Sequence, residues 1–179
     1  MALSLGLHQG EALGLPWDAV DLEAGTLTVR QRQRQPGVGL VIVVPKSAAG
    51  RRTITLPVSL RDALRGPRAE QAAERLAARS QWEDRGLVFA QANGKPIDPA
   101  ADYKAWKALL QAASVRDARL HDARHTAASL LLLQRVPARV AMDVLGHSAI
   151  ALTLNTYSHV MPELAQDAAE RMERALWGK

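Results

Sequence analysis

The stretch HDARHTAASLLLLQRVPARVAMDVLGHS, residues 121–148, decides the fold. Its spacing of apolar residues predicts a helix over His121–Gln134. A second helix is predicted over Pro137–Leu145, because the N–H group that proline lacks would have no partner in a first turn. Gly146 then follows as a typical helix stop. Two helices this close together indicate that this half of the chain is a helical bundle.

Helical character extends over everything after Pro57. The chain there is rich in Ala, Glu and Arg, and prolines stand at the expected helix starts. The residue pattern predicts four further helices, at Val58–Ser80, Pro99–Ala113, Ile150–Tyr157 and Pro162–Trp177.

In the region before Pro57 the apolar residues recur with the two-residue period of strands and not with the period of a helix. Polar and apolar residues alternate from Thr26 to Gln33, as in a half-exposed strand, and two more β runs follow at Gly39–Val44 and Arg52–Leu56. We expect these runs to form one small three-stranded antiparallel sheet, with Lys46 at or near a turn. The predicted fold is therefore α+β and mainly α, a small sheet followed by helices.

Composition limits the class of protein. The 179 residues suffice for a single domain over 1–179, and the absence of cysteine excludes disulfides and thiolate sites. No apolar run is long enough to span a bilayer, so a cytoplasmic protein is the default expectation. The chain opens directly inside an apolar-periodic segment, from which we expect that a preceding portion is missing.

Charge points to nucleic acid. Lys and Arg outnumber Asp and Glu by 23 to 18, a formal net charge of +5, and no acidic residue occurs from Gly25 to Arg61. A one-sided basic region is what phosphate contacts require, although a solvated strand surface has the same composition. The candidate DNA-binding residues in it are Arg30, Arg32, Arg34, Arg51 and Arg52.

The first helix quoted above carries a cluster of polar residues. His121, Arg124 and His125 lie three and four positions apart and share one helix face. The pattern is similar to the His-Glu-x-x-His zinc helix of metalloproteases, but Arg124 would place a permanent cation beside the metal. A structural pair of histidines is a second interpretation.

The residues that follow favour a third interpretation. Leu145-Gly146-His147 comes next, and Tyr157-Ser158-His159 begins ten residues after His147. His-x-x-Arg, Leu-Gly-His and Tyr-x-His in this order resemble the signature of the tyrosine recombinases, the phage integrase family. The resemblance extends back to Lys46, which matches a β-hairpin lysine of the family, and to a first motif that begins near His8 and includes Glu11.

The resemblance implies roles for these residues. Tyr157 would attack a DNA phosphate, Arg124 and His147 would bind its nonbridging oxygens, and His121 would bond the phosphate or assist removal of the tyrosine proton. Lys46 would protonate the departing 5′ oxygen. Glu11, His125 and His159 would support the site. The resemblance implies no metal or other cofactor, because side chains supply the cations.

One residue departs from the family pattern. His8 stands where family members carry the first arginine of the catalytic pair. Histidine is shorter than arginine and has an ordinary pKa near 6.5, so the change leaves full activity, weak activity and a cleavage-dead relic as alternatives. Loss of one transition-state donor commonly costs about 100- to 1000-fold in rate.

The resemblance also implies partners and a place in a longer protein. Family members bind double-stranded DNA as tetramers and carry a separate DNA-binding domain and further catalytic-domain residues before this region, so we expect a monomer or weak dimer free in solution. Pro162–Trp177 presents an apolar stripe that packs within the chain or on a neighbouring subunit. A defective fragment that only binds DNA or partner subunits, a type IB topoisomerase and a zinc hydrolase remain alternatives.

Overall fold

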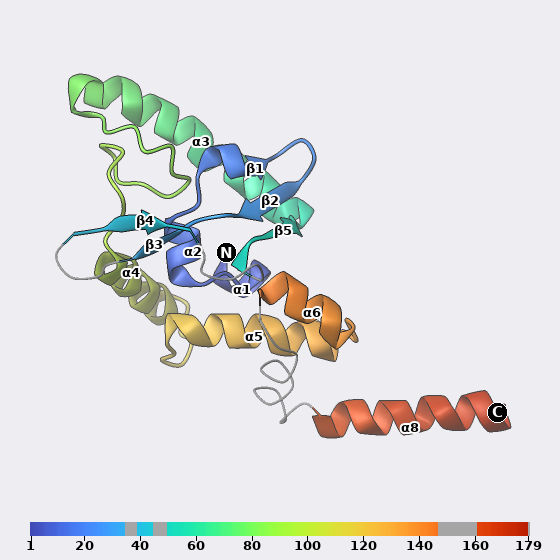
Figure 1. Cartoon of the computed structure of the whole chain (residues 1–179). Helices are drawn as coiled ribbons and strands as arrows, with labels where there is room; N and C mark the ends of the chain where they lie inside the picture. The colour runs from blue at the N-terminus through green and yellow to red at the C-terminus, as the bar shows by residue number, and fades with distance from the viewer. Residues whose placement is uncertain (35–38, 45–49, 147–160, 179) are drawn as a thin grey trace.

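The computed structural model describes residues 1–34, 39–44, 50–146 and 161–178. It is α+β and mainly helical, as predicted, with the strands in the first third of the chain (Figure 1). The elements follow in the order α1 (Ala2–Leu5), α2 (Gln9–Leu13), η1 (Trp17–Ala19), β1 (Val20–Asp21), β2 (Thr26–Val29), β3 (Arg32–Arg34), β4 (Val41–Val43), β5 (Arg52–Thr55), α3 (Val58–Ala78), η3 (Arg79–Gln81), α4 (Pro99–Ala112), α5 (Leu120–Leu133), α6 (Ala138–Leu145) and α8 (Met161–Trp177).

A small three-stranded antiparallel sheet is present, as predicted, but its strands are not all from the three expected runs, and a second, two-stranded sheet is also formed. One sheet has the antiparallel order β1-β2-β5, in which Leu27 pairs with Ile54, and β3 and β4 form a separate antiparallel pair. The expected strand Gly39–Val44 therefore belongs to the second sheet. The side chain of Gln33 in β3 is buried and donates to the Ile97 carbonyl at 2.7 Å, which links β3 to the segment before α4.

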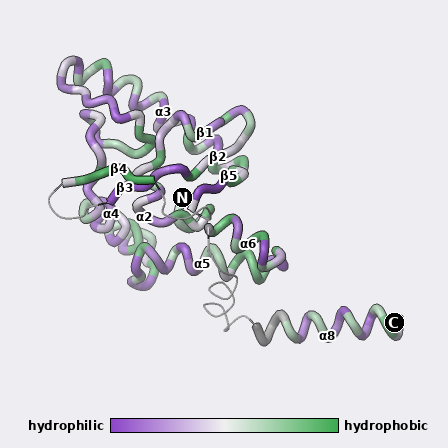
Figure 2. Tube along the Cα trace, viewed as in Figure 1, coloured by the Kyte–Doolittle hydropathy of each residue, from purple (hydrophilic) through white to green (hydrophobic). Residues whose placement is uncertain are grey.

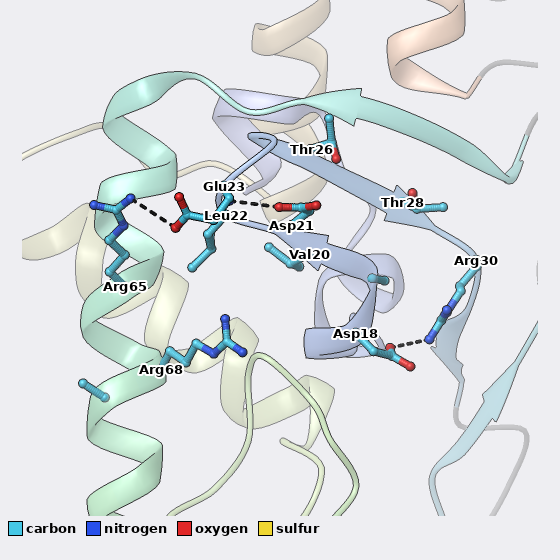
Figure 3. Close-up of a pocket in the computed structure, with 12 residues that line it drawn as sticks. Asp18, Val20, Asp21, Leu22, Glu23, Thr26, Thr28, Arg30, Arg65 and Arg68 are labelled. Carbon is cyan, nitrogen blue, oxygen red and sulfur yellow. Dashed lines mark hydrogen bonds and ion pairs between the residues drawn. The ribbon is translucent and has the colours of Figure 1, made fainter.

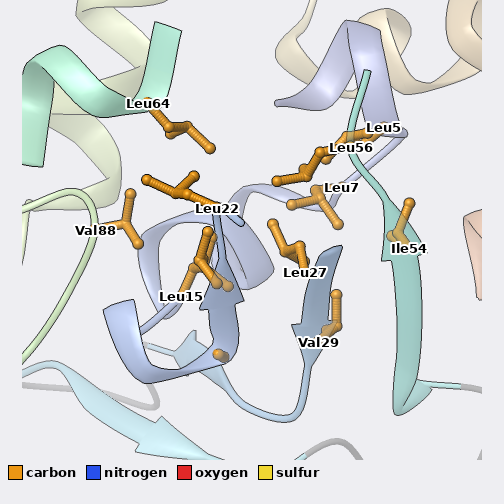
Figure 4. Close-up of a cluster of buried hydrophobic side chains, with 12 residues drawn as sticks. Leu5, Leu7, Leu15, Leu22, Leu27, Val29, Ile54, Leu56, Leu64 and Val88 are labelled. Carbon is orange, nitrogen blue, oxygen red and sulfur yellow. The ribbon is translucent and has the colours of Figure 1, made fainter. Parts of the chain in front are cut away.

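The main hydrophobic core lies between the three-stranded sheet, α1 and α3. Leu7, Leu27 and Val29 are at most 1% exposed, and Leu64 of α3 closes the core from one side. Figure 4 shows side chains of the strands β2 and β5 and of the segment after α1 pointing into this cluster. Burial of these aliphatic side chains stabilises the fold by about 2 kcal/mol each.

A second core joins α5 and α6. Ala128 and Leu132 of α5 pack against Ala141 and Leu145 of α6, and all four are buried. The α6 helix ends at Gly146, whose φ of 72° places it in the left-handed region that glycine tolerates, as predicted. The last turn of α6, which leads to residue 147, is thereby fixed beside α5.

The helix predictions after Pro57 agree with the structure to within two or three residues, apart from Ile150–Tyr157, which lies outside the described residues. Asp98 caps α4 by accepting from the Ala100 N–H at 2.7 Å. The tube along α8 alternates between hydrophilic and hydrophobic residues (Figure 2). Its Asp167 pairs with Arg135 after α5, while Met172 and Leu176 are 58% and 60% exposed.

Candidate active site

The N-terminal half of α5 presents three of the predicted site residues. Arg119 precedes the helix, and its backbone N–H and guanidinium both donate to Asp122, at 2.8 Å and 2.9 Å. Both Asp122 carboxylate oxygens are thus engaged by Arg119. His121 and His125 meet edge to face with centroids 4.6 Å apart, which confirms that they share a helix face.

His8 approaches the same cluster from the start of α2. It has an extended backbone at the N-cap, where its N–H donates to Glu11 Oε2 at 3.0 Å. Its ring stacks on His121, with centroids 5.6 Å apart and planes inclined by 10°. The structure thus brings together residues that are 113 positions apart in the sequence, since 121 minus 8 is 113.

Both stacked imidazoles are neutral at neutral pH. Partial withdrawal from water, and then the positive charge of Arg124, lowers the pKa of His8 to about 4. Glu11 opposes this shift, while His121 and Arg52 add to it. The pKa of His121 is lowered by burial first and then by His125 and Arg124. Without a bound anion, position 8 therefore lacks the positive charge that an arginine would bring.

Arg124 lies at the centre of the cluster and is 2% exposed. One terminal nitrogen donates to the carbonyl of Gly6, and the other donates to the carbonyl of Leu145 at 2.6 Å. Gly6 precedes His8 by two residues, and Leu145 precedes His147 by two residues. A single guanidinium thus holds together the two chain segments that lead to these predicted site residues.

Glycine at position 6 makes this approach possible. Its φ is 62°, in the left-handed region, and a Cβ atom there would lie 2.3 Å from Leu145 Cδ2. A residue with a Cβ atom at this position would force the Leu145 side chain to shift. The turn after α1 therefore has both a conformational and a packing reason to be glycine.

The prediction that Arg52 contacts DNA needs correction. Its side chain is 7% exposed, and its terminal nitrogens bind the two oxygens of Glu11, each at 3.0 Å. Its Nε donates to the Val144 carbonyl at 2.7 Å. The guanidinium is thus directed into the fold and is not presented to a phosphate at the surface.

A signal for this burial was available in the sequence. Side chains two positions apart in a strand share a face, and Arg52 is two positions from Ile54, which is 4% exposed. Glu11 is the partner that makes the buried charge tolerable. Burial alone would raise the pKa of Glu11, but the hydrogen bonds and charge of Arg52 bring it below its ordinary value.

The remaining basic candidates differ in their surroundings. Arg30 pairs with Asp18, and its side chain is 45% exposed. Arg32 is half-buried at the start of β3, whereas Arg34 and Arg51 are exposed. Of the predicted DNA contacts, Arg34 and Arg51 are therefore the most accessible to a phosphate backbone.

Four predicted site residues lie outside the described residues: Lys46, His147, Tyr157 and His159. Their neighbours in the chain locate the segments that lead to them. Gly146, at the end of α6, directly precedes His147. The β5 strand begins six residues after Lys46.

A cleft of about 430 Å³ lies over the stacked histidines. His8, Gln9 and Gly10 line one side of it, and Arg119 and His121 line the other, together with Leu7, Tyr103 and Leu120. Gln9 is fixed by hydrogen bonds of 2.9 Å to the Pro99 carbonyl and 2.8 Å to Asp102. No sequence motif identifies Tyr103, because only the packing of α4 brings it to this cleft, whereas Arg119 directly precedes α5 and lies two residues before His121.

A larger cavity, of about 760 Å³, lies elsewhere. It opens between α3 and the β1–β2 strands, and Figure 3 shows its charged side chains directed toward one another. Arg30 pairs with Asp18, and Arg65 lies 3.9 Å from Glu23. Of the predicted catalytic residues that the structure describes, His8, His121 and Arg124, none lines this cavity, so size alone does not locate the active site.

Within the part of the chain that the structure describes, no group of three or more His, Cys, Asp or Glu side chains is placed to hold a metal ion. None of the described helices is long and apolar enough to cross a membrane.

Proteins of known family are similar to this chain over nearly its whole length. An integrase of Saccharopolyspora erythraea is 36% identical over 99% of this chain and 52% of its own length. A protein described as tyrosine recombinase XerC-like, from Caldanaerobacter subterraneus, is 33% identical over 96% of this chain and 47% of its own length. The chain spans about half the length of the curated relatives it matches.

Solved structures show the same fold. The Tn1549 transposon integrase, solved in complex with transposon right end DNA, superposes with a TM-score of 0.78 over 95% of this chain and 56% of its own, at 23% identity. The XerA recombinase superposes with a TM-score of 0.68 over 99% of this chain and 55% of its own, at 20% identity. The sequence profile described as "Phage integrase family" matches residues 1–163, and the chain belongs to this family of tyrosine recombinases.

Proposed function

We propose that this chain carries the strand-cleaving site of a site-specific DNA recombinase, acting as the catalytic part of a phage or mobile-element integrase. Tyr157 would attack a DNA phosphate and form a 3′-phosphotyrosyl link. The observation that carries the proposal is the position of Arg124, whose guanidinium binds the segments that lead to His8 and to His147. Residues from three distant parts of the sequence thereby converge on one place.

The chemistry follows from these groups. The attacked phosphate develops charge on its nonbridging oxygens, and the five N–H donors of a guanidinium are enough to hold backbone carbonyls and a phosphate together. A phosphate bound there would place its negative charge beside the buried guanidinium of Arg124. His147 supplies a further hydrogen bond to the same oxygens.

Proton transfer uses the lowered pKa of His121. A neutral imidazole accepts the proton that Tyr157 loses as its oxygen bonds to phosphorus. The bond from phosphorus to the 5′ oxygen then breaks, and Lys46 gives that oxygen a proton. Because the phosphotyrosyl link keeps the energy of the phosphodiester, a different 5′ hydroxyl can attack it and rejoin the strand.

Relatives support double-stranded DNA as the partner. The Tn1549 transposon integrase was solved with transposon right end DNA and, at 26% identity, with circular intermediate DNA. We propose that this chain acts on such DNA together with other recombinase subunits, as a tetramer on DNA.

A nicked suicide substrate tests the proposal. The nick lets the short fragment that bears the new 5′ hydroxyl diffuse away, so the strand cannot be rejoined and the covalent protein–DNA adduct accumulates. We expect a DNA-linked peptide that contains Tyr157 and not Tyr103, the other of the two tyrosines. Tyr157→Phe should abolish the adduct while DNA binding in a mobility-shift assay persists. An adduct that survives Tyr157→Phe would refute the proposed nucleophile.

One observation favours a second candidate function, binding of DNA or recombinase subunits without cleavage. The lowered pKa of His8 leaves position 8 uncharged at neutral pH, so one of the expected transition-state cations is missing. The two functions are separated by restoring that cation. Absence of any adduct in both the wild-type chain and His8→Arg, with DNA binding intact, would favour the second function.

A further inference from the structure

Arg52 makes contacts that connect most of the candidate site. Its two terminal nitrogens bind Glu11, its Nε binds the Val144 carbonyl, and its backbone pairs with Val29 in the sheet. Glu11 in turn accepts from the N–H of His8. A single side chain therefore connects β5, the start of α2 and the last turn of α6.

These three elements are the ones that carry or lead to predicted site residues. The β5 strand follows the segment that contains Lys46, α2 begins directly after His8, and α6 leads to His147. Arg124 ties two of the same segments through Gly6 and Leu145. Arg52 and Arg124 therefore each link the His8 segment to the end of α6 through hydrogen bonds.

We propose that Arg52 is a positioning residue of the active site, which holds the His8 end of α2 against the end of α6 and fixes both to β5. The geometry requires a fork of donors. A guanidinium reaches two carboxylate oxygens and a carbonyl at once, whereas the single nitrogen of lysine cannot. The proposal rests on the proposed function, since the positioned groups act there on a DNA phosphate.

The test must separate positioning from simple stability. Removing Arg52 alone would leave Glu11 buried and unpaired, which is strongly destabilising. The double variant Arg52→Met/Glu11→Gln removes both charges and keeps an amide oxygen to accept from the His8 N–H. Arg139→Met is the matched control, because Arg139 is an exposed α6 arginine that pairs with an acid, Asp143, at 3.5 Å.

Cleavage and DNA affinity are measured separately on the suicide substrate. Small displacements of catalytic groups cost about 100-fold in rate, so we expect the double variant to form adduct about 100-fold more slowly at saturating DNA. Its dissociation constant for DNA and its thermal midpoint should stay close to wild type. Arg52→Lys, which keeps the charge beside Glu11, should rescue the rate only in part. Wild-type rates in either variant would overturn the proposal.

Hydrogen exchange gives a readout that does not depend on cleavage. With the tie to Val144 removed, the amides of residues 144–146 should exchange faster in the double variant than in wild type or in Arg139→Met. If the wild-type chain forms no adduct, the proposed function fails, and exchange alone decides the role of Arg52. Unchanged exchange at these amides would show that Arg52 does not hold the end of α6.

Discussion

The His8 ring stacks on the His121 ring, at a centroid distance of 5.6 Å and an angle of 10° between the planes. This contact joins α2 to α5 beside the buried guanidinium of Arg124. Partial burial of both rings, and after it nearby positive charge that includes Arg124, lowers the pKa of each ring and favours its neutral form. A bound phosphate would act in the opposite direction, because its negative charge favours protonation.

His8→Arg should increase adduct formation. An arginine plane stacks on an aromatic ring as His8 does, and it brings a permanent charge to the cleft. Since removal of one transition-state donor costs about 100- to 1000-fold, we expect a gain of about 10-fold or more at saturating DNA. The rate is measured by single-turnover adduct formation on the suicide substrate.

The control for this experiment is Gln111→Arg, which adds the same charge at an exposed position of α4. It should tighten DNA binding at most slightly and leave the adduct rate unchanged. If His8→Arg has no effect on the rate, position 8 is not part of the catalytic cluster.

Stability should depend on pH through the same histidines. The pKa of His8 is about 4 in the folded chain and near 6.5 in the unfolded chain, so between these values the unfolded chain binds more protons. The free energy of unfolding should therefore fall as the pH drops from about 6.5 toward 4. Glu11, whose folded pKa is also lowered, loses its contribution only below its unfolded value, near 4.5.

Urea unfolding at about pH 7 and about pH 5 measures this dependence. His8→Gln should reduce the difference in unfolding free energy between the two pH values without removing that difference, because the pKa of His121 is lowered as well. An unaltered difference between the two pH values in His8→Gln would mean that His8 titrates normally in the folded chain.

The helices were predictable because their signals are local. The apolar spacing in α5, the proline before α6 and Gly146 after it each act within a few residues. The three predicted β runs contain strands, but β1 was not predicted, the run Thr26–Gln33 divides into β2 and β3, and the pairing was not predictable. Alternation fixes which face a side chain occupies, and it does not decide whether β4 pairs with β3 or with β5.

The site was predictable in its residue types and not in its internal contacts. Motif spacing placed His121 and Arg124 together, since they lie on one helix turn. The stacking of His8 on His121 depends on tertiary contact between the start of α2 and α5, which local sequence patterns do not reveal. Arg52 is buried, and not exposed to DNA as predicted, because it pairs with Glu11, a partner 41 residues away in sequence.

Gly6→Ala should destabilise the chain and misplace His8. The left-handed backbone costs a non-glycine residue about 1 to 2 kcal/mol, and the added Cβ would overlap the buried Leu145 side chain. We expect a loss of about 2 kcal/mol or more in the free energy of unfolding. Gly66→Ala, in the middle of α3 with open space around it, is the matched control and should be neutral or stabilising. Equal stabilities of the two variants would contradict the packing argument.

Arg34→Gln should weaken DNA binding in a salt-dependent way. Arg34 is exposed at the end of β3, so its guanidinium is accessible to a phosphate. Each phosphate contact releases about one counterion, so loss of the contact should reduce the slope of log affinity against log salt by about 1. Arg75→Gln on α3, which removes an exposed arginine paired with Asp84 at 3.0 Å, should leave the slope unchanged. Equal slopes for wild type and Arg34→Gln would place the DNA on another face, because a side chain in contact with phosphate cannot be removed without changing the number of ions released.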